Sequence, residues 1–187
     1  MKIVAIGIGE CGGKITDTFY NLNNYAKSVL NRRIEIVTDA FALNSDKADL
    51  EALRHLCKDK YHRIELGGIR TAGHGVGKIN ITGTEIAKAS HSDLVSAVID
   101  SRKYGEADAV VVVASGGGGT GSGAIVWFAR ELKRRLGDLG NNTESLLPKK
   151  ECLYFGQALM SHVWLLSILV MIFALSASKE QQTSLLI

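Results

Sequence analysis

Hydrophobic residues follow two different spacings along this chain. Continuous runs of about four to eight apolar, mostly β-branched residues are typical of strands that are buried on both faces. Such runs predict strands over residues 2–6, 33–37, 63–66 and 107–114. Apolar residues three or four positions apart predict helices over residues 13–31 and 46–58, from about Thr84 onward, and up to about Leu136. Because strands and helices alternate, we predict an α/β fold, a Rossmann-like parallel sheet with helices on both faces.

The pattern changes after Leu136. Residues 137–150 contain the only proline of the chain, residues 151–159 can serve as a further strand, and residues 158–177 are almost wholly apolar. We therefore expect residues 1–136 to form the main globular part and residues 137–187 to form an atypical apolar tail. Three interpretations of this tail stay open. It can be the product of a truncation or frameshift, a core helix or strand, or a membrane span of roughly 20 residues.

Charge and cysteine content narrow the class of protein. The 187 residues carry a net charge of +3, and the basic residues are spread along the chain, which argues against nucleic acid as a partner. The three cysteines show neither a disulfide framework nor a zinc pattern, so we predict a reducing, cytoplasmic location. The group His55, Cys57 and His62 lacks a fourth metal ligand, and we interpret it as part of a partly exposed amphipathic helix.

Glycines gather where predicted strands end. The stretch SGGGGTGSG, residues 115–123, joins an apolar strand to a helix, and two other glycine-rich loops follow strands at residues 7–13 and 67–77. In a parallel sheet such loops share the edge formed by the carboxyl ends of the strands, where ligands bind. Their backbone amides, together with the N-termini of helices, can bind phosphate. One polyphosphate site would explain all three loops.

Two other phosphate-binding folds, the Rossmann fold and the P-loop, also have glycine-rich loops after a strand. Gly7, Gly9 and Gly12 fit the pattern G-x-G-x-x-G, and Asp39 ends the next predicted strand, so a Rossmann-type NAD-dependent dehydrogenase is an alternative. That alternative leaves the second and third glycine loops without a role. A P-loop is excluded, because Lys14 is followed by Ile15 and not by a serine or threonine.

Four segments resemble the nucleotide loops of the tubulin/FtsZ superfamily. SGGGGTGSG resembles its signature G-G-G-T-G-[ST]-G, and GECGGKI resembles its first loop. TDAFALNSDKAD is similar to the second loop, and GHGVGKINITGTEIA to the third loop of the archaeal CetZ branch. The resemblance covers about residues 1–136, in the order and spacing of the family, and CetZ is the branch that it resembles most.

The resemblance implies a truncated GTPase domain that binds GTP or GDP with Mg²⁺. The matching positions are Gly9, Glu10, Cys11 and Lys14 in the first loop, Asp39 and Ala40 in the second, Gly73, Gly75, Val76, Gly77 and Asn80 in or just after the third, and Gly117, Gly118, Gly119, Thr120, Gly121 and Ser122 in the signature loop. Glu10 replaces the usual glutamine, and a carboxylate facing a triphosphate requires a cation between them. We predict that Glu10 is linked to Mg²⁺; the alternative is that it turns to solvent or pairs with Lys14.

Proteins of this family form filaments, and an N-x-D-x-x-D loop from their second half completes GTP hydrolysis in the next subunit. The only such letters here, NSDKAD at residues 44–49, are interpreted as the cap of a helix. We therefore assign no catalytic residue and expect weak nucleotide binding without independent hydrolysis. The implied role is in cell division or cell shape, with the chain itself or a full-length relative as partner. A membrane-anchored regulator without enzymatic activity, held by residues 158–177, is a further alternative.

Overall fold

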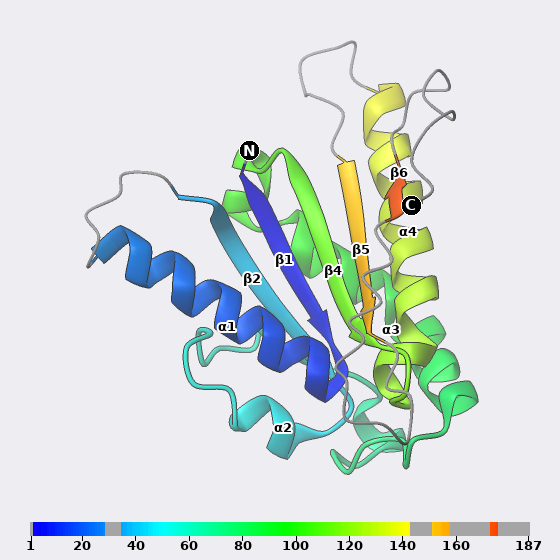
Figure 1. Cartoon of the computed structure of the whole chain (residues 1–187). Coiled ribbons are helices and arrows are strands. Elements are labelled where there is room, and N and C mark those ends of the chain that lie inside the picture. The colour runs from blue at the N-terminus through cyan, green and yellow to red at the C-terminus, as the bar shows by residue number, and fades with distance from the viewer. Residues whose placement is uncertain (1, 29–34, 143–150, 158–172, 176–187) are drawn as a thin grey trace.

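The structure, a computed structural model, describes residues 2–28, 35–142, 151–157 and 173–175 (Figure 1). Its centre is one sheet with the strand order β3-β2-β1-β4-β5-β6, in which every pair of neighbours is parallel except β5 and β6. The strands are β1 (Ile3–Ile8), β2 (Val37–Asn44), β3 (Arg63–Glu65), β4 (Ala109–Ser115), β5 (Glu151–Gln157) and β6 (Phe173–Leu175).

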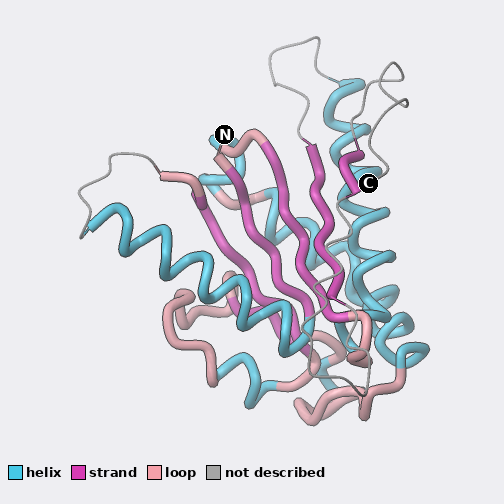
Figure 2. Tube along the Cα trace, viewed as in Figure 1, coloured by secondary structure: helices cyan, strands magenta, loops and turns pink. Residues whose placement is uncertain are grey.

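Helices cover both faces of the sheet, which confirms the predicted fold class (Figures 1 and 2). On one face α1 and α2 pack over small strand residues such as Ala5, Ala40 and Ala42. On the other face α3 and α4 pack over larger ones such as Ile6 and Val112. The helices are α1 (Gly9–Ser28), α2 (Lys47–Glu51), α3 (Asn80–Ile99) and α4 (Thr120–Asn142), with short 3₁₀ turns η1 (Gly68–Arg70) and η2 (Arg102–Glu106).

The second strand lies later in the chain than the hydrophobic pattern predicts. The prediction placed it at residues 33–37, but β2 runs from Val37 to Asn44 and is buried along its whole length. Its polar residues are tolerated because they have partners inside the fold. The hydroxyl of Thr38 donates to the carbonyl of Ile3 at 3.1 Å, and the amide group of Asn44 donates to Asp49 at 2.9 Å. The strand therefore ends at Asn44, not at Asp39.

The predicted helix over residues 46–58 is wrong beyond Glu51, where α2 ends. In a longer helix the carbonyls and amides of this segment would bond to one another. Here two side chains from other parts of the chain bind them instead. The Arg63 guanidinium donates to five carbonyls at 2.6–3.4 Å, those of Leu50, Glu51, Leu53, Leu56 and Cys57. The Asp17 carboxylate accepts from three amides at 2.7–3.2 Å, those of Arg54, His55 and Leu56. An irregular loop results.

Two helix boundaries also differ from the expected ones. The third helix begins at Asn80 instead of about Thr84, because Gly83 lies inside it and packs against α4. The fourth helix continues to Asn142. None of the helices in the described ranges is long and apolar enough to span a bilayer. The apolar segment 158–177 falls outside those ranges except for β6, so its three interpretations stay predictions.

Candidate functional site

The glycine-rich loops lie together at one edge of the sheet. The strands β1, β2, β3 and β4 are parallel, so their carboxyl ends all reach the edge at which the β1 arrowhead points in Figure 1. The loops that follow these strands gather there in Figure 2. Two helices begin at this edge, because α1 starts directly after β1 and α4 starts at Thr120 after the signature loop. This arrangement was predicted from the sequence.

The first loop and the signature loop are in direct contact. Gly9 has a φ of 78°, and a Cβ added there would lie 3.0 Å from the backbone nitrogen of Gly121. A Cβ added to Gly121 would lie 2.8 Å from the carbonyl oxygen of Ile8. Only glycine fits either position without displacing backbone. The close contact brings the N-termini of α1 and α4 side by side, and both favour negative charge.

The third loop contacts the signature loop from the other side. A Cβ on Gly119 would meet Val76 Cγ2 at 2.6 Å and Lys78 Cα at 2.8 Å. The Asn80 side-chain amide donates to the Ser122 hydroxyl at 2.9 Å, and that hydroxyl donates to the carbonyl of Gly118. The third loop therefore packs against the turn that opens α4, so that residues far apart in the sequence line the same edge.

The loop after β2 completes this edge through residues that the sequence analysis missed. The hydroxyls of Ser45 and Thr120 lie 2.6 Å apart. The Ser45 carbonyl accepts from the amide of Gly75 at 3.1 Å, and the Gly73 carbonyl accepts from the amide of Lys47 at 3.0 Å. A signal was present in the sequence, because the Asn-Ser-Asp triplet that ends at Asp46 is typical of a strand end followed by a helix cap.

The capping prediction for residues 44–49 is confirmed. Asp46 is the N-cap of α2, and its carboxylate accepts from the amides of Ala48 and Asp49 at 2.9 and 3.3 Å. The side chain of Asp49 accepts from Asn44, as described above. These acidic groups therefore hold the start of the helix beside the loop edge.

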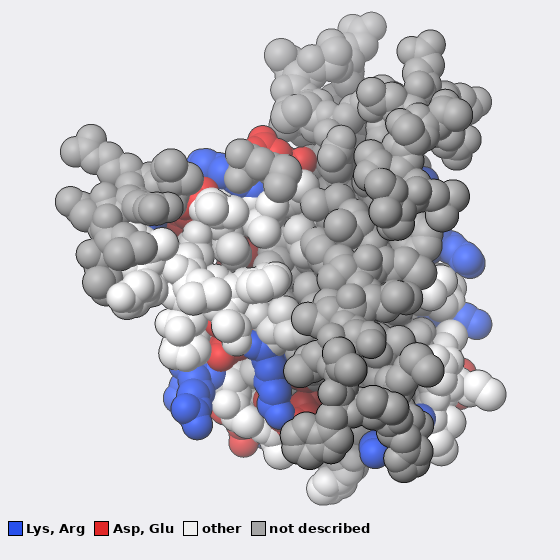
Figure 3. Space-filling view, viewed as in Figure 1, with Lys and Arg blue, Asp and Glu red and all other residues white. Residues whose placement is uncertain are grey.

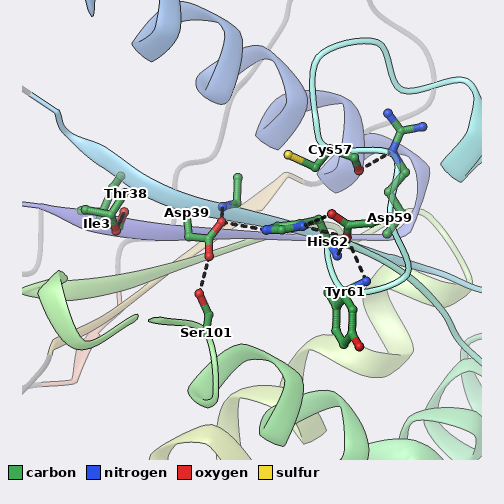
Figure 4. A network of polar contacts seen from close by, with 10 residues as sticks. Ile3, Thr38, Asp39, Cys57, Asp59, Tyr61, His62 and Ser101 are labelled. Atoms are coloured by element: carbon green, nitrogen blue, oxygen red, sulfur yellow. Dashed lines mark hydrogen bonds and ion pairs between the residues drawn. The ribbon is translucent and has the colours of Figure 1, made fainter. Parts of the chain in front are cut away.

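Asp39 and Ala40, which were matched to the second loop, lie elsewhere. Both are buried inside β2, and Asp39 is five residues from the end of the strand, about 17 Å at 3.3–3.4 Å per residue. The Asp39 carboxylate lies 3.1 Å from Nε2 of His62 and accepts from the Ser101 hydroxyl (Figure 4). Burial alone would raise the pKa of Asp39, but these two hydrogen bonds and the charge of His62 lower it. The structure does not bring Asp39 to the glycine loops.

Charge at the loop edge is mixed. The Glu10 carboxylate and the Lys14 ammonium lie 2.5 Å apart, and both side chains are more than half exposed. This hydrogen bond raises the pKa of Lys14. The pKa of Asp49 is raised by burial first and then by the charges of Glu10 and Asp46, so three carboxylates affect one another here. Figure 3 shows acidic and basic side chains interspersed on the visible described surface, as the sequence predicted.

Cys11 lies beside this charged group, in the first turn of α1. Its side chain is partly buried. Burial raises the pKa of the thiol, and the neighbouring Glu10 raises it further, although Lys14 opposes this. The thiol is therefore protonated near neutral pH, which fits a small packing residue at the loop edge.

These features define a class of protein: a parallel α/β domain whose glycine loops and helix N-termini lie together at the carboxyl edge of the sheet, an arrangement suited to binding an anion. A sequence model of the tubulin/FtsZ family, GTPase domain, matches residues 2–153. The chain belongs to the tubulin/FtsZ family.

Similar proteins come from the CetZ branch, as the resemblance implied. The chain is 43% identical over 134 residues to the tubulin-like protein CetZ1 of Haloferax volcanii, covering 72% of this chain and 32% of that protein. It is 32% identical over 151 residues to the tubulin-like protein CetZ of Pyrococcus abyssi, covering 81% and 37%. The chain thus spans about a third of the length of these curated relatives.

Solved structures show the same relationship. The GDP-bound monomer of CetZ1 from Haloferax volcanii matches with a TM-score of 0.66 and 36% identity, over 84% of this chain and 41% of that one. The GTPγS-bound protofilament of CetZ2 from the same organism matches with a TM-score of 0.59 and 29% identity, over 84% and 39%. Both fold and sequence therefore agree with the assignment.

Proposed function

We propose that this chain binds a guanine nucleotide, GTP or GDP, at the carboxyl edge of its sheet. One observation carries the proposal: the loops after β1, β3 and β4 touch one another at glycines that leave no room for a Cβ. Such contacts hold the backbone of separate loops close together at one edge, and binding several phosphate oxygens at once requires loops placed in this way. Similar proteins are named as GDP-bound and GTPγS-bound.

The amides of Gly117 to Gly121 are the main donors in this proposal, since they precede or open α4. The hydroxyl of Thr120 lies in the first turn of that helix and adds a short side-chain donor, while the Ser122 hydroxyl, which donates to the Gly118 carbonyl, holds the loop in shape. Gly73, Gly75 and Gly77 all have positive φ angles of 58–77° and shape the third loop around the outermost phosphate. Ser45 enters this set because of its contact with Thr120.

Mg²⁺ fits the same edge for an electrostatic reason. The Lys14 ammonium of the first loop is already neutralised by Glu10. A nucleotide that carries several negative charges would therefore face three carboxylates without compensation. A bound Mg²⁺ would lie between the phosphates and Glu10, with oxygen ligands from both. Glu10 remains the residue we expect to link the metal, directly or through water.

Because the chain belongs to the tubulin/FtsZ family, we do not propose the alternative of an NAD-dependent dehydrogenase. An NAD site would need Asp39 at the loop edge, and the structure places this residue in the interior of β2 with His62 and Ser101 as partners. We also propose that the chain associates with itself or with a full-length relative, since a similar protein is named as a protofilament. No residue of this chain is proposed to catalyse hydrolysis, because residues 44–49 serve as a helix cap.

The proposal is tested by a matched pair of substitutions. A Cβ added at Gly118 or at Gly105 meets nothing within 4 Å, and both glycines have ordinary φ angles, so aspartate fits at either site. The two variants gain the same charge, but only Gly118→Asp places it in the signature loop. We expect Gly118→Asp to weaken binding of a fluorescent GTP analogue at least tenfold, about 1.4 kcal/mol, by repelling the phosphates.

Gly105→Asp should bind the analogue as the natural chain does. Binding is measured by fluorescence titration of the full chain with Mg²⁺, and unlabelled GDP, ATP and NAD are added as competitors. Equal effects of the two substitutions, or stronger competition by NAD than by GDP, would show that the glycine edge is not a guanine-nucleotide site. Unfolding curves of both variants verify that the fold is intact.

A further inference from the structure

A second group of ligand-type side chains lies away from the glycine loops, between α2 and β3. The Cys57 sulfur, a carboxylate oxygen of Asp59 and a ring nitrogen of His62 all lie within 4.8 Å of one another. Figure 4 shows Cys57 and Asp59 on the loop beside the His62 ring. Cys57 and Asp59 are exposed, whereas His62 is half-buried, so an ion can enter from solvent. His55, included in the sequence-based group, is not part of this cluster.

The orientation of His62 is fixed from two directions. Its Nε2 lies 3.1 Å from Asp39 Oδ1, and its Nδ1 lies 2.8 Å from Asp59 Oδ1. The ring also stacks on Phe41, with centroids 5.3 Å apart and planes 17° apart. If the Nε2 proton is donated to Asp39, the lone pair of Nδ1 points toward Asp59. A carboxylate behind a histidine in this way is the common outer partner of a metal-bound imidazole.

The loop that carries Cys57 is held in place by hydrogen bonds from two side chains outside it. The Arg63 guanidinium donates to the Cys57 carbonyl at 3.1 Å, to two other carbonyls of the loop and to two at the end of α2. Asp17 binds the amides just before it, as described above. The ligand atoms are therefore close together before any ion binds. In a tetrahedral site with bonds of 2.0–2.3 Å the ligands lie about 3.3–3.8 Å apart, so the 4.8 Å spread would contract by about 1 Å and the 2.8 Å separation of His62 Nδ1 and Asp59 Oδ1 would open by about 0.5 Å.

We propose that Cys57, Asp59 and His62 bind Zn²⁺, with thiolate sulfur, carboxylate oxygen and imidazole Nδ1 as ligands and water at the fourth position. This set of donor atoms suits zinc, since thiolate and imidazole select it over Mg²⁺ or Ca²⁺. Asp39 and Ser101 form the second layer: Ser101 donates to Asp39, and Asp39 accepts from His62. His62 precedes Arg63, which pairs with Ala42, so the site lies beside β2 about three residues, or about 10 Å, from the end of the strand at the loop edge. None of its ligands belongs to the glycine loops, so we expect it to bind metal independently of the nucleotide.

The test uses Co²⁺ as a spectroscopic substitute for Zn²⁺ on the full, reduced chain. We expect one Co²⁺ per chain, with a near-ultraviolet thiolate-to-cobalt band that one equivalent of Zn²⁺ removes. Cys57→Ser should abolish this band. The matched control is His55→Gln, which removes a neighbouring exposed imidazole outside the cluster and should leave the band unchanged. Asp39→Asn, a positioning variant, should weaken zinc affinity about tenfold and keep the band at saturating metal.

Three results would overturn the proposal. They are a cobalt band that survives Cys57→Ser, equal losses in Cys57→Ser and His55→Gln, and the absence of a saturable band in the natural chain. In the last case the cluster is an ion-pair network in which protonated His62 bridges Asp39 and Asp59. Circular dichroism of each variant shows whether the fold is retained. His62→Gln, which keeps a hydrogen-bonding side chain next to Asp39, serves as a second ligand variant and should also lose the band.

Discussion

The glycine edge and the loop between α2 and β3 are built in opposite ways. At the glycine edge the loops meet at positions that leave no room for a Cβ: one on Gly119 would lie 2.6 Å from Val76 Cγ2, and one on Gly121 would lie 2.8 Å from the carbonyl oxygen of Ile8. In the other region, backbone that forms no regular structure is bound by side chains, chiefly Asp17 and Arg63. The first construction exposes amides to a ligand, and the second consumes them inside the protein.

The glycine edge is therefore suited to binding a ligand, whereas the hydrogen bonds of the α2–β3 loop support the fold. Amides that are not bonded to each other remain available for phosphate oxygens, so the glycine edge is suited to an anion. The backbone of the α2–β3 loop is bonded to Asp17 and Arg63, and three of its side chains, Cys57, Asp59 and His62, bring metal-ligand atoms together at the surface. The four predictions below perturb one region or the other, beginning with the largest effect.

Removing Asp17 should give the largest loss of stability. Its carboxylate is buried and accepts three backbone hydrogen bonds. Asp17→Ala therefore leaves the backbone amides of residues 54–56 without their acceptor. We expect a loss of about 3 kcal/mol in the free energy of unfolding, measured by urea denaturation. Asp17→Asn, which keeps one acceptor, should lose about half as much. Thr18→Ala, at the exposed neighbouring residue, is the control. If Asp17→Ala lowers the free energy of unfolding by less than Thr18→Ala does, the role given to Asp17 is contradicted.

Two adjacent glycines should respond differently to the same substitution. Gly119→Ala places a methyl group 2.6 Å from Val76 and should lower the free energy of unfolding by about 2 kcal/mol. Gly118→Ala meets nothing within 4 Å and should change it by less than about 0.5 kcal/mol. Thermal and urea unfolding of both variants measure the difference. Equal values would mean that the third loop does not pack against the signature loop.

Glu10→Gln should make nucleotide binding less dependent on Mg²⁺. The substitution removes a carboxylate from the first loop and releases Lys14, so binding of a GTP analogue in EDTA should strengthen about tenfold, or 1.4 kcal/mol. With saturating Mg²⁺ the gain should disappear. Glu51→Gln is the matched control, since Glu51 also pairs with a lysine four residues away, at 3.8 Å from Lys47. Identical Mg²⁺ dependence in Glu10→Gln and the natural chain would exclude Glu10 as a metal link.

Thiol alkylation should distinguish the two regions by several-fold rate differences. Burial and Glu10 raise the pKa of Cys11, so at pH 7.5 less of it is thiolate than at an ordinary cysteine, and it should react more slowly than exposed Cys57. GDP with Mg²⁺ should slow alkylation of Cys11 only, and Zn²⁺ should slow that of Cys57 only. Peptide mass spectrometry measures both rates. Protection of both thiols by either ligand would contradict two independent sites.

The features that depend on local backbone geometry, such as the glycine loops, were predicted from the sequence. The features that depend on side chains distant in the sequence were predicted wrongly. The glycine loops were found because no other residue fits where Gly9 meets Gly121. Asp39 was placed at a strand end because a buried carboxylate in mid-strand is costly, and its partners His62 and Ser101 lie 23 and 62 residues away. The helix predicted to Lys58 ends at Glu51 because Arg63 binds its carbonyls instead.

One spectrum tests the central claim, that the three glycine loops form a single guanine-nucleotide site. The full chain, labelled with ¹⁵N, is titrated with GDP and Mg²⁺ while its amide signals are followed. We predict that the amides of Gly9, Gly75 and Gly117–Gly121 shift together and saturate at the same ligand concentration, whereas those of Cys57 and Asp59 stay in place. Shifts confined to one loop, or saturation at different concentrations in different loops, would contradict it.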